Sequence, residues 1–311
     1  MAETTHFEMI IIGSGPAGFT AAIYGARGGA TTALFGGVAP GGQLLATMEI
    51  ENFPGFTDPV VGAELMERMM KQATRLGTVV FHENAVSVDF EHRPFSITSG
   101  SGKVFTTGAV IIATGAQAKW LGMPSEMKYI SKGVSGCATC DGFFYRGKEI
   151  CVIGGGDSAA EDALFLSKFA AKVHLVHRRN TLRANFRLQE KLRANPKIEV
   201  IYDHVPEEFV GKEKLSAVKL KNLKTGATHI LNVHGAFIAI GHTPATKLFA
   251  GKVNLDDSGY IVVDDKMATS VYGVFAAGDV MDTRYKQAVV AAGSGCKAAM
   301  EALVYLEETK K

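Results

Sequence analysis

Two cysteines, Cys137 and Cys140, are separated by only two residues, a spacing that can support chemistry. It lets the two sulfur atoms close a small disulfide ring, and nearby positive charge or a helix end can lower the pKa of one thiol. Zinc binding is the alternative, but a zinc site needs a second pair of ligands. The remaining cysteines, Cys151 and Cys296, stand alone in a strand-like and a helix-like segment and are expected to pack in the core. The pattern therefore favours redox chemistry over metal binding.

An acidic residue, Asp141, directly follows the second cysteine. We hypothesise that it is a general acid, which protonates the thiolate released when the disulfide opens. The alternative is an aspartate that only caps a turn or a helix. The histidines supply no competing site, because His174 and His177 are three residues apart on a predicted strand and face opposite sides.

Two glycine loops each follow an apolar strand and precede a helix. The first is Gly13-Ser14-Gly15-Pro16-Ala17-Gly18, between a strand at 7–12 and a helix from Phe19 to about Gly28. The second is Gly154-Gly155-Gly156-Asp157-Ser158-Ala159, between a strand at 150–153 and a helix at about 160–169. Such glycines permit a tight turn, close approach of backbone N–H groups to a pyrophosphate, and close packing of helix on strand. Two such units predict two dinucleotide-binding domains.

The strand after the second loop, residues 172–176, is followed by the basic residues His177, Arg178, Arg179 and Arg183. An acidic residue at the strand end would bind the 2′-hydroxyl of an adenosine ribose. Guanidinium groups suit a 2′-phosphate instead, because they make planar, charge-assisted hydrogen bonds to its oxygens. The second loop is therefore expected to bind NADPH; the alternative is a solvated basic face.

The strand after the first loop ends near Gly36 and Gly37, with neither an acid nor an arginine cluster. FAD is expected here because Asp279, at the end of a strand at 274–277, can accept a hydrogen bond from a sugar or ribityl hydroxyl. A predicted helix from Gln287 to Glu307 follows, and the dipole at its start favours electron density on a reduced flavin. The alternative for Asp279 is a buried turn cap.

The composition is that of a globular chain long enough for two domains, with 311 residues, 47% of them apolar and 21% charged. A formal net charge of +2 gives no electrostatic footprint for nucleic acid or an anionic membrane. The uncharged stretch from Met9 to Ala26 is broken by glycines and a proline, so we expect a strand, a turn and a helix rather than a membrane span. The acidic start predicts no secretory signal, and four cysteines without one indicate a reducing cytoplasm.

The order of these elements indicates an inserted domain. The second glycine unit lies within 118–243, and the pieces before and after it, 1–117 and 244–311, each lack part of a domain. The expected fold class is therefore α/β, with two Rossmann-like dinucleotide-binding domains, the second inserted into the first.

Along essentially its whole length the chain resembles the low-molecular-weight thioredoxin reductases of bacteria, plants, fungi and some protists. The residues that carry the resemblance are the two glycine loops, 41–44 (GGQL), 51–55 (ENFPG), 113–116 (ATGA), 137–144 (CATCDGFF), 177–179 (HRR), 278–280 (GDV) and 287–288 (QA). The dithiol just before the second glycine loop is the most specific of these, because related flavoproteins place their cysteines in the FAD domain or lack them.

The resemblance implies a homodimer that carries electrons from NADPH through FAD to the disulfide and on to thioredoxin. Cys140 would lie nearer the flavin, Cys137 would attack the disulfide of the partner, and Asp141 would donate the proton. Phe143 and Phe144 would belong to the surface that meets thioredoxin. The residues implied to bind FAD are Gly13, Ser14, Gly15, Pro16, Ala17, Gly42, Gln43, Leu44, Asn52, Thr114, Gly115, Gly278, Asp279, Lys286, Gln287 and Ala288. Those implied to bind NADPH are Gly154, Gly156, Asp157, Ser158, His177, Arg178, Arg179, Arg183 and Gly241.

Two positions depart from the family pattern. Many relatives have a glutamate near Gly36 or Gly37 for the FAD ribose, and its absence leaves that contact unassigned. Many also have arginine where Lys286 stands, a change that keeps the charge but loses the planar fork.

The motif order also predicts a motion. Gly154 comes only 14 positions after Cys140, yet the dithiol and the nicotinamide must both reach one isoalloxazine held by the other domain. We therefore predict that the inserted domain rotates on two strands near 115–118 and 241–245 and presents nicotinamide and disulfide in turn. Cross-linking the domains would then permit one half-reaction and block the other.

Two other functions stay open on the sequence. A flavoprotein disulfide reductase or oxidase of the same architecture would share every cofactor residue and act on a peroxiredoxin module, a small disulfide or oxygen. A non-enzymatic flavin- or zinc-binding protein would lose no activity when Cys137 is replaced.

Overall fold

The structure, a computed structural model, describes residues 5–47 and 49–310. Residues 1–4, part of the acidic start that predicts no secretory signal, lie outside the described residues. The chain forms two compact units, Met1–Gln117 with Thr243–Lys311, and Ala118–His242. The second unit interrupts the first, and the return to the first unit comes one residue earlier than the expected boundary after residue 243.

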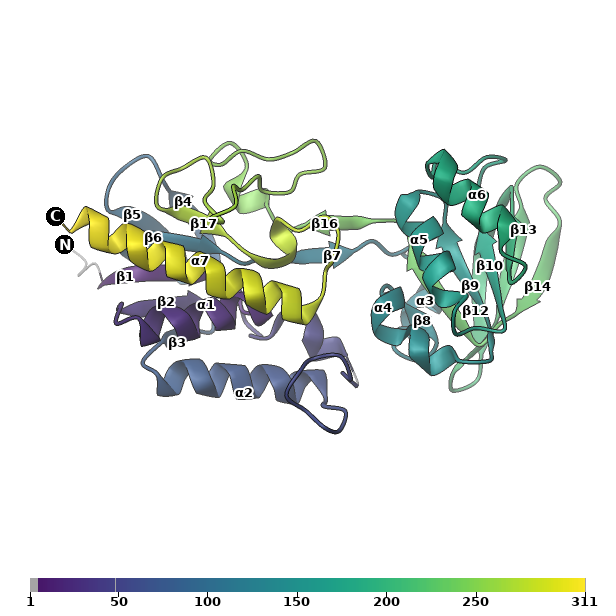
Figure 1. The fold of residues 1–311 in the computed structure, drawn as a ribbon, viewed down its shortest axis with the longest axis horizontal. Coiled ribbons are helices and arrows are strands. Elements are labelled where there is room, and N and C mark those ends of the chain that lie inside the picture. Colours follow the sequence, from purple (N-terminus) through teal and green to yellow (C-terminus); the bar gives the residue numbers. More distant parts are fainter. Residues whose placement is uncertain (1–4, 48, 311) are drawn as a thin grey trace. The chain divides into compact units, whose positions relative to one another are not determined.

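The first unit is built on a seven-stranded sheet in the order β3-β2-β1-β6-β5-β4, with β17 paired to β6 (Figure 1). Strands β3, β2, β1, β6 and β17 run parallel, whereas β5 and β4 are antiparallel additions. The strands are β1 (Thr5–Ile12), β2 (Thr32–Phe35), β3 (Val79–Phe81), β4 (Ala85–Asp89), β5 (Phe95–Ser99), β6 (Val104–Ile112) and β17 (Val274–Ala276). Because β17 comes from the C-terminal piece, neither piece of the first unit completes the sheet alone.

Alternate residues of β1 enter two hydrophobic clusters. Met9 and Ile11 pack with the helices on one face of the sheet, and Ile10 and Ile12 pack with a phenylalanine-rich cluster on the other. The helical elements of this unit are α1 (Pro16–Arg27), η1 (Gly42–Ala46), α2 (Gly62–Arg75), η3 (Lys247–Phe249), η4 (Gly278–Val280) and α7 (Ala288–Thr309). Burial on both faces explains why β1 reads as a continuous apolar run.

Helix α7 is, among the described residues, the one helix long and apolar enough to cross a membrane. Its inner face packs along α1 (Figure 1), and Ala298, Ala299 and Ala302 on that face are fully buried in the core. The small residues of this face therefore serve close helix packing. Cys296 lies beside that face and is half-exposed, with its Sγ 3.9 Å from Met300 Sδ, so the expectation that this cysteine packs in the core was wrong.

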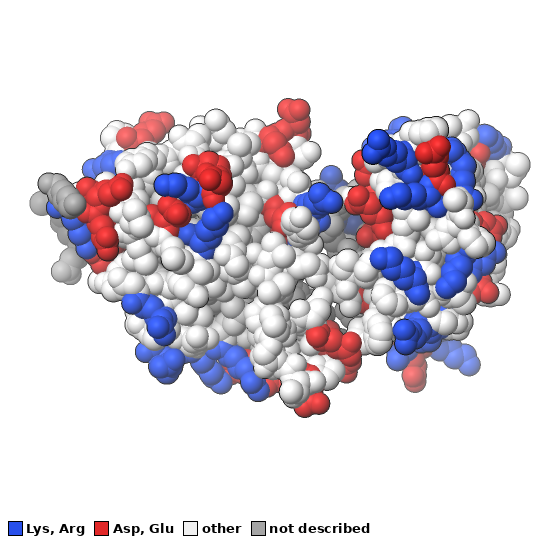
Figure 2. All heavy atoms as spheres, viewed as in Figure 1, with Lys and Arg blue, Asp and Glu red and all other residues white. Residues whose placement is uncertain are grey.

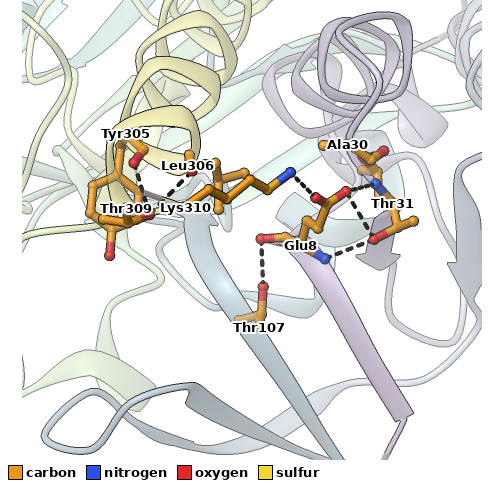
Figure 3. Close-up of polar contacts among 9 residues, drawn as sticks. Glu8, Ala30, Thr31, Thr107, Tyr305, Leu306, Thr309 and Lys310 are labelled. Atoms are coloured by element: carbon orange, nitrogen blue, oxygen red, sulfur yellow. Dashed lines mark hydrogen bonds and ion pairs between the residues drawn. The ribbon is translucent and has the colours of Figure 1, made fainter.

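The C-terminal end of α7 is tied to the first strand through Glu8 (Figure 3). The Glu8 carboxylate accepts hydrogen bonds from Lys310 Nζ and from the Thr31 backbone N–H, the latter at 2.7 Å. The hydrogen bond from Lys310 is the main reason that the pKa of Glu8 lies below its ordinary value. Thr107 Oγ1 donates to the Glu8 carbonyl at 3.2 Å, so β1, β6 and the chain end are joined at one point.

The second unit has a parallel five-stranded sheet in the order β11-β10-β9-β15-β8 and an antiparallel three-stranded sheet, β12-β13-β14. Its strands are β8 (Val134–Ser135), β9 (Glu149–Gly154), β10 (Lys172–Val176), β11 (Ile198–Ile201), β12 (His204–Gly211), β13 (Leu215–Asn222), β14 (Thr228–Asn232) and β15 (Gly235–Ala239). Its helical elements are α3 (Pro124–Tyr129), α4 (Ala138–Asp141), η2 (Gly142–Tyr145), α5 (Asp157–Leu166) and α6 (Phe186–Ala194). Ile150 and Val152 of β9 pack toward α5, and the fully buried Cys151 packs on the other face, as expected.

A two-stranded ribbon of β7 (Ala116–Ala118) and β16 (His242–Pro244) contains both chain crossings between the units. Further hydrogen bonds hold the two segments in register. The Ala245 N–H donates to Gly115 O at 2.9 Å, and the Lys119 N–H donates to Gly241 O at 2.9 Å.

Both glycine-loop helices begin about three residues earlier than the sequence suggested. Pro16 stands in the first turn of α1, where its missing N–H costs nothing, and α5 begins at Asp157 directly after Gly156. The helices thus start inside the glycine motifs, which brings their N-terminal N–H groups to the loops. The paired strand, loop and helix units themselves are as expected.

We expect opposite effects from alanine at two glycines of α7. A Cβ at Gly295 would lie 2.1 Å from Ala17 O, whereas one at Gly293 would meet nothing within 4 Å. Gly295→Ala should lower the free energy of unfolding by about 1–3 kcal/mol through overpacking. Gly293→Ala should raise it by roughly 0.5–1 kcal/mol through helix propensity. Denaturant unfolding followed by circular dichroism measures both, and equal effects would contradict the close α1–α7 contact.

Candidate functional site

Cys137 and Cys140 are joined in a disulfide, with a Cα–Cα distance of 5.4 Å, at the start of α4. Cys140 is exposed and Cys137 is half-buried. The Cys140 backbone N–H donates to Cys137 Sγ at 3.2 Å, and Thr139 Oγ1 lies 3.5 Å from the same sulfur. Both donors would stabilise negative charge on Cys137 when the disulfide opens, so the geometry favours this sulfur as the thiolate.

The Asp141 carboxyl is largely withdrawn from water, and this burial raises its pKa above the ordinary value. A hydrogen bond from Ser135 partly opposes the shift. Tyr145 lies nearby, and burial together with the charge of Asp141 raises its pKa to about 12. A carboxyl with a raised pKa keeps its proton closer to neutral pH, which suits a proton donor.

The glycines at the start of the second loop pack so closely against neighbouring residues that they leave no room for a side chain. A Cβ at Gly154 would lie 2.3 Å from Ala239 O, and one at Gly155 would lie 2.1 Å from His177 Nδ1. The carbonyl of Gly155 accepts the N–H groups of Arg183 and Ala184, at 2.7 and 3.1 Å. The loop and the segment that follows β10 are therefore held together.

The basic residues after β10 lie in two environments. His177 is buried, its pKa is lowered mainly by burial, and its Nε2 has no hydrogen-bond partner in the protein. Arg178, Arg179 and Arg183 are exposed. Figure 2 shows Lys and Arg side chains gathered on the second unit over α6. An unpartnered buried nitrogen beside free guanidinium groups fits an anionic ligand on this loop.

Other expected residues of this unit also lie at the loop. Asp157 begins α5, and its Oδ1 accepts the Asn185 N–H at 2.7 Å, which joins the starts of α5 and α6. Ser158 follows on α5 and is exposed. Gly241, in contrast, lies between β15 and the ribbon, where its carbonyl accepts the Lys119 N–H at 2.9 Å.

The first glycine loop shows three distinct uses of glycine. A Cβ at Gly13 would lie 2.2 Å from Ala113 O, and one at Gly18 would lie 1.9 Å from Gly13 O. One at Gly15 would meet nothing within 4 Å, so that face of the backbone is open to a ligand. Ser14 Oγ donates to Gly36 O at 2.7 Å and accepts from the Gly41 N–H at 3.0 Å, which holds the loops after β1 and β2 together.

The structure brings together further residues that are far apart in the sequence. Asn52 Nδ2 donates to Gln287 Oε1 at 3.2 Å, across 235 residues of chain. Gln43 Nε2 donates to Ala116 O, and Thr114 Oγ1 donates to Ala245 O at 2.8 Å. Gly42 and the half-buried Leu44 lie in η1, beside Gln43. A Cβ at Gly42 would lie 3.3 Å from Gly15 Cα, which places η1 against the first glycine loop.

The C-terminal part of the candidate site starts at the end of β17. A Cβ at Gly278 would lie 2.8 Å from Ala17 Cβ, so this turn reaches the first glycine loop. Burial raises the pKa of Asp279 to about 6, against the opposing effect of Lys286. Burial also lowers the pKa of Lys286, whose Nζ donates to Thr283 O at 2.7 Å. Ala288 is the first residue of α7, next to this pair.

A metal centre finds no support. Among residues 5–47 and 49–310, no three His, Cys, Asp or Glu side chains are grouped so that they could hold a metal ion. His174 contacts Glu149 and Glu199 at 3.3 and 3.4 Å, whereas His177 lies against Gly155. The two histidines thus do not share a site, as expected.

Comparisons with known proteins show the family of the chain. Residues 7–295 match the family model described as pyridine nucleotide-disulphide oxidoreductase. The thioredoxin reductase of Rickettsia conorii is 50% identical over 305 residues, 97% of this chain and 98% of the relative. A solved thioredoxin reductase from Giardia duodenalis is 43% identical, with a TM-score of 0.94 over 98% of this chain and 100% of that one. The Lactococcus lactis enzyme, solved in what is termed its FR conformation, is 41% identical over 97% and 99% of the two chains, with a TM-score of 0.65.

The chain belongs to the thioredoxin reductases. They are members of the pyridine nucleotide-disulphide oxidoreductase family, and this chain is accordingly an NADPH-dependent FAD oxidoreductase of α/β fold with two dinucleotide-binding domains. The fold class and both cofactors expected from the sequence are thereby confirmed. The role of each individual residue stays a prediction.

Sequence reasoning missed the roles of two serines. It did not show that Ser14 links two loops, and it did not single out Ser135. Ser14 was expected only as a member of the glycine loop, but it links that loop to Gly36 and Gly41. Ser135 lies next to the dithiol motif, and its Oγ accepts the Cys137 N–H at 3.0 Å. A hydroxyl two residues before a reactive cysteine is the signal that could have indicated it.

Proposed function

We propose that this enzyme passes electrons from NADPH through FAD to the Cys137–Cys140 disulfide and then to the disulfide of thioredoxin. The disulfide is the main support for this proposal. It lies in an accessible turn beside Asp141, the candidate proton donor, and in the same unit as the second glycine loop and the arginines next to it. The relatives named above are thioredoxin reductases, which supports thioredoxin as the acceptor.

We infer that the first unit holds FAD, which supplies two-electron chemistry between nicotinamide and disulfide when it is bound. The open backbone at Gly15 and the approach of Gly278 to Ala17 support a pyrophosphate at this loop. Asp279 and the start of α7 would orient the ribityl chain and the ring. The full proposed set is Gly13, Ser14, Gly15, Pro16, Ala17, Gly42, Gln43, Leu44, Asn52, Thr114, Gly115, Gly278, Asp279, Lys286, Gln287 and Ala288.

We assign NADPH to the second unit. The unpartnered Nε2 of His177 and the exposed Arg178 and Arg179 support a 2′-phosphate there. The full proposed set is Gly154, Gly156, Asp157, Ser158, His177, Arg178, Arg179, Arg183 and Gly241.

The two sulfurs take different parts in the proposed reaction. Cys137, whose sulfur has the nearby N–H and hydroxyl donors, would attack the thioredoxin disulfide as the thiolate. Cys140 would then close the ring again and release reduced thioredoxin. Asp141 would supply the proton when the enzyme disulfide opens.

We propose that the two units change their relative orientation during the cycle. Both chain crossings lie in the β7–β16 ribbon, so few bonds need to adjust. The Giardia and Lactococcus enzymes are almost equally similar to this chain in sequence but differ widely in TM-score. Such a difference is what two rigid units in different orientations produce.

Exposed apolar residues support two interaction surfaces. Phe143 and Phe144, 52% and 39% exposed, directly follow the dithiol helix and would contact thioredoxin. The outer face of α7 exposes Val290, Met300 and Val304, which supports a homodimer through that face. The cysteines outside the disulfide are unpaired, in keeping with a reducing cytoplasm, and no nucleic acid or membrane partner is proposed.

Serine variants of the two cysteines directly test the proposed electron path through the disulfide. Cys137→Ser and Cys140→Ser should each abolish NADPH-dependent reduction of thioredoxin, because thiol–disulfide exchange needs both sulfurs. Each should still bind FAD and let NADPH reduce it. Cys296→Ser is the matched control, since Cys296 is not paired, and should keep full activity. Undiminished thioredoxin reduction by either of the first two variants would contradict the proposal.

Replacement of two arginines tests the choice of nucleotide. The double variant Arg178→Ala/Arg179→Ala should raise the KM for NADPH by about 10–100-fold and leave the KM for NADH nearly unchanged, because charge-assisted bonds to the 2′-phosphate are lost. Arg187→Ala, on α6 beyond the loop, is the control. Steady-state kinetics with both nucleotides measure the effect. An equal loss for NADPH and NADH would show that the arginines do not contact the phosphate.

A further inference from the structure

A single carboxylate joins the N-terminal ends of α5 and α6. Asp157, the first residue of α5, accepts two hydrogen bonds on Oδ1, from the Asn185 backbone N–H at 2.7 Å and from Asn185 Nδ2 at 3.3 Å. Asn185 is the N-cap of α6, and its own Oδ1 accepts the Leu188 N–H at 3.1 Å. The bonds to Asp157 are charge-assisted and therefore stronger than neutral ones. The carboxylate thus fixes the residue from which α6 starts.

The two residues before Asn185 are held at the second glycine loop. The Gly155 carbonyl accepts the N–H groups of both Arg183 and Ala184, at 2.7 and 3.1 Å. Three consecutive residues are therefore bonded to the glycine loop or to the helix that begins there. This arrangement leaves the backbone of Arg183 little freedom.

The anchored backbone places the Arg183 side chain at the loop. A Cβ at Gly156 would lie 3.8 Å from Arg183 Nη2, so the guanidinium group stands beside the last glycine before α5. The Arg183 side chain is also exposed. A helix N-terminus and a guanidinium group both favour phosphate, and a donor that is already in place loses less entropy when a ligand binds.

We propose that Asp157 is a positioning residue, which acts through Asn185 to hold the Arg183 guanidinium in place for the 2′-phosphate of NADPH. This inference rests on the proposed function, which assigns NADPH to this unit. It gives Asp157 a part other than direct contact with the nucleotide. A carboxylate at the start of α5 would repel a phosphate group, whereas here its Oδ1 is occupied by two N–H donors of the protein.

The experiment compares two ligands of the FAD-loaded enzyme by calorimetry, adenosine 2′,5′-bisphosphate and 5′-AMP, which lacks the 2′-phosphate. Asp157→Ala should raise the Kd for the bisphosphate by about fivefold, because Arg183 is less well held. The Kd for 5′-AMP should change by less than about twofold, because that ligand does not use the guanidinium group. Asp157→Asn loses the same charge but keeps an acceptor oxygen for Asn185, so it should recover most of the affinity.

A matched control removes a similar bond at the opposite ends of the same two helices. Asn195 Nδ2 donates to Ser167 Oγ at 2.9 Å, and these residues cap the C-terminal ends of α6 and α5. Asn195→Ala should leave the Kd values for both ligands at their wild-type levels. In the Arg183→Ala background, Asp157→Ala should have no further effect, because Asp157 acts only through Arg183.

Failure of the inference and failure of the proposed function give different results. A wild-type enzyme that binds both ligands equally well would contradict the assignment of NADPH to this loop, and the inference would fall with it. If wild type prefers the bisphosphate, an unchanged or lower Kd in Asp157→Ala overturns the inference alone. Equal losses for both ligands, or an undiminished effect in the Arg183→Ala background, would do the same.

Two further variants keep the inference testable. Asp157→Asn as weak as Asp157→Ala would show that the charge matters rather than the bond to Asn185, and would overturn the inference. If Asp157→Ala does not fold, Asn185→Asp decides. That variant keeps an N-cap acceptor for α6 but sets a second carboxylate against Asp157, so it should raise the Kd for the bisphosphate. A wild-type Kd in Asn185→Asp would contradict the proposed role.

Discussion

The short stretch of chain between the disulfide and the second glycine loop, which is proposed to bind NADPH, is the constraint on which the rest of the structure depends. Gly154 comes 14 positions after Cys140 within one unit, while the backbone expected to hold the flavin belongs to the other. Neither the disulfide nor the loop can leave that unit, so the proposed cycle requires the unit to move as a whole. A unit that moves as one body needs a complete core of its own and few connections, and the structure provides both.

The glycine loops show how backbone contact creates the two binding surfaces. At Gly13, Gly18 and Gly154 the chain passes so close to another carbonyl that any side chain would collide with it. A side chain at Gly15, in contrast, would meet nothing within 4 Å. The same residue type therefore closes the fold at some positions and leaves room for a phosphate at another. The electrostatic surroundings then differ between the loops, with exposed guanidinium groups at the second and the half-buried Asp279, whose pKa is raised, near the first.

Sequence reasoning was most successful where a local rule governs the structure. Strand, loop and helix around Gly13–Gly18 follow from apolar runs and turn chemistry, and the Cys-x-x-Cys spacing gave the disulfide. It failed where the answer depends on distant contacts. The bond from Asn52 to Gln287 joins segments 235 residues apart, and no local pattern predicts it. Cys296 is half-exposed because α7 buries only one face, and the periodicity alone did not show on which side the cysteine lies. Ser135 was missed because its bond to the Cys137 N–H depends on how the chain turns after β8.

The central claim is that NADPH reduces the flavin, and that the flavin passes the electrons to thioredoxin through the sulfurs of Cys137 and Cys140. Anaerobic titration of the FAD-loaded enzyme with NADPH, followed by visible absorbance and by counting free thiols, tests it most directly. The account predicts uptake of about two equivalents of NADPH per chain, one for the flavin and one for the disulfide, with two new thiols. Complete bleaching of the flavin after about one equivalent, with no thiols gained, would contradict it.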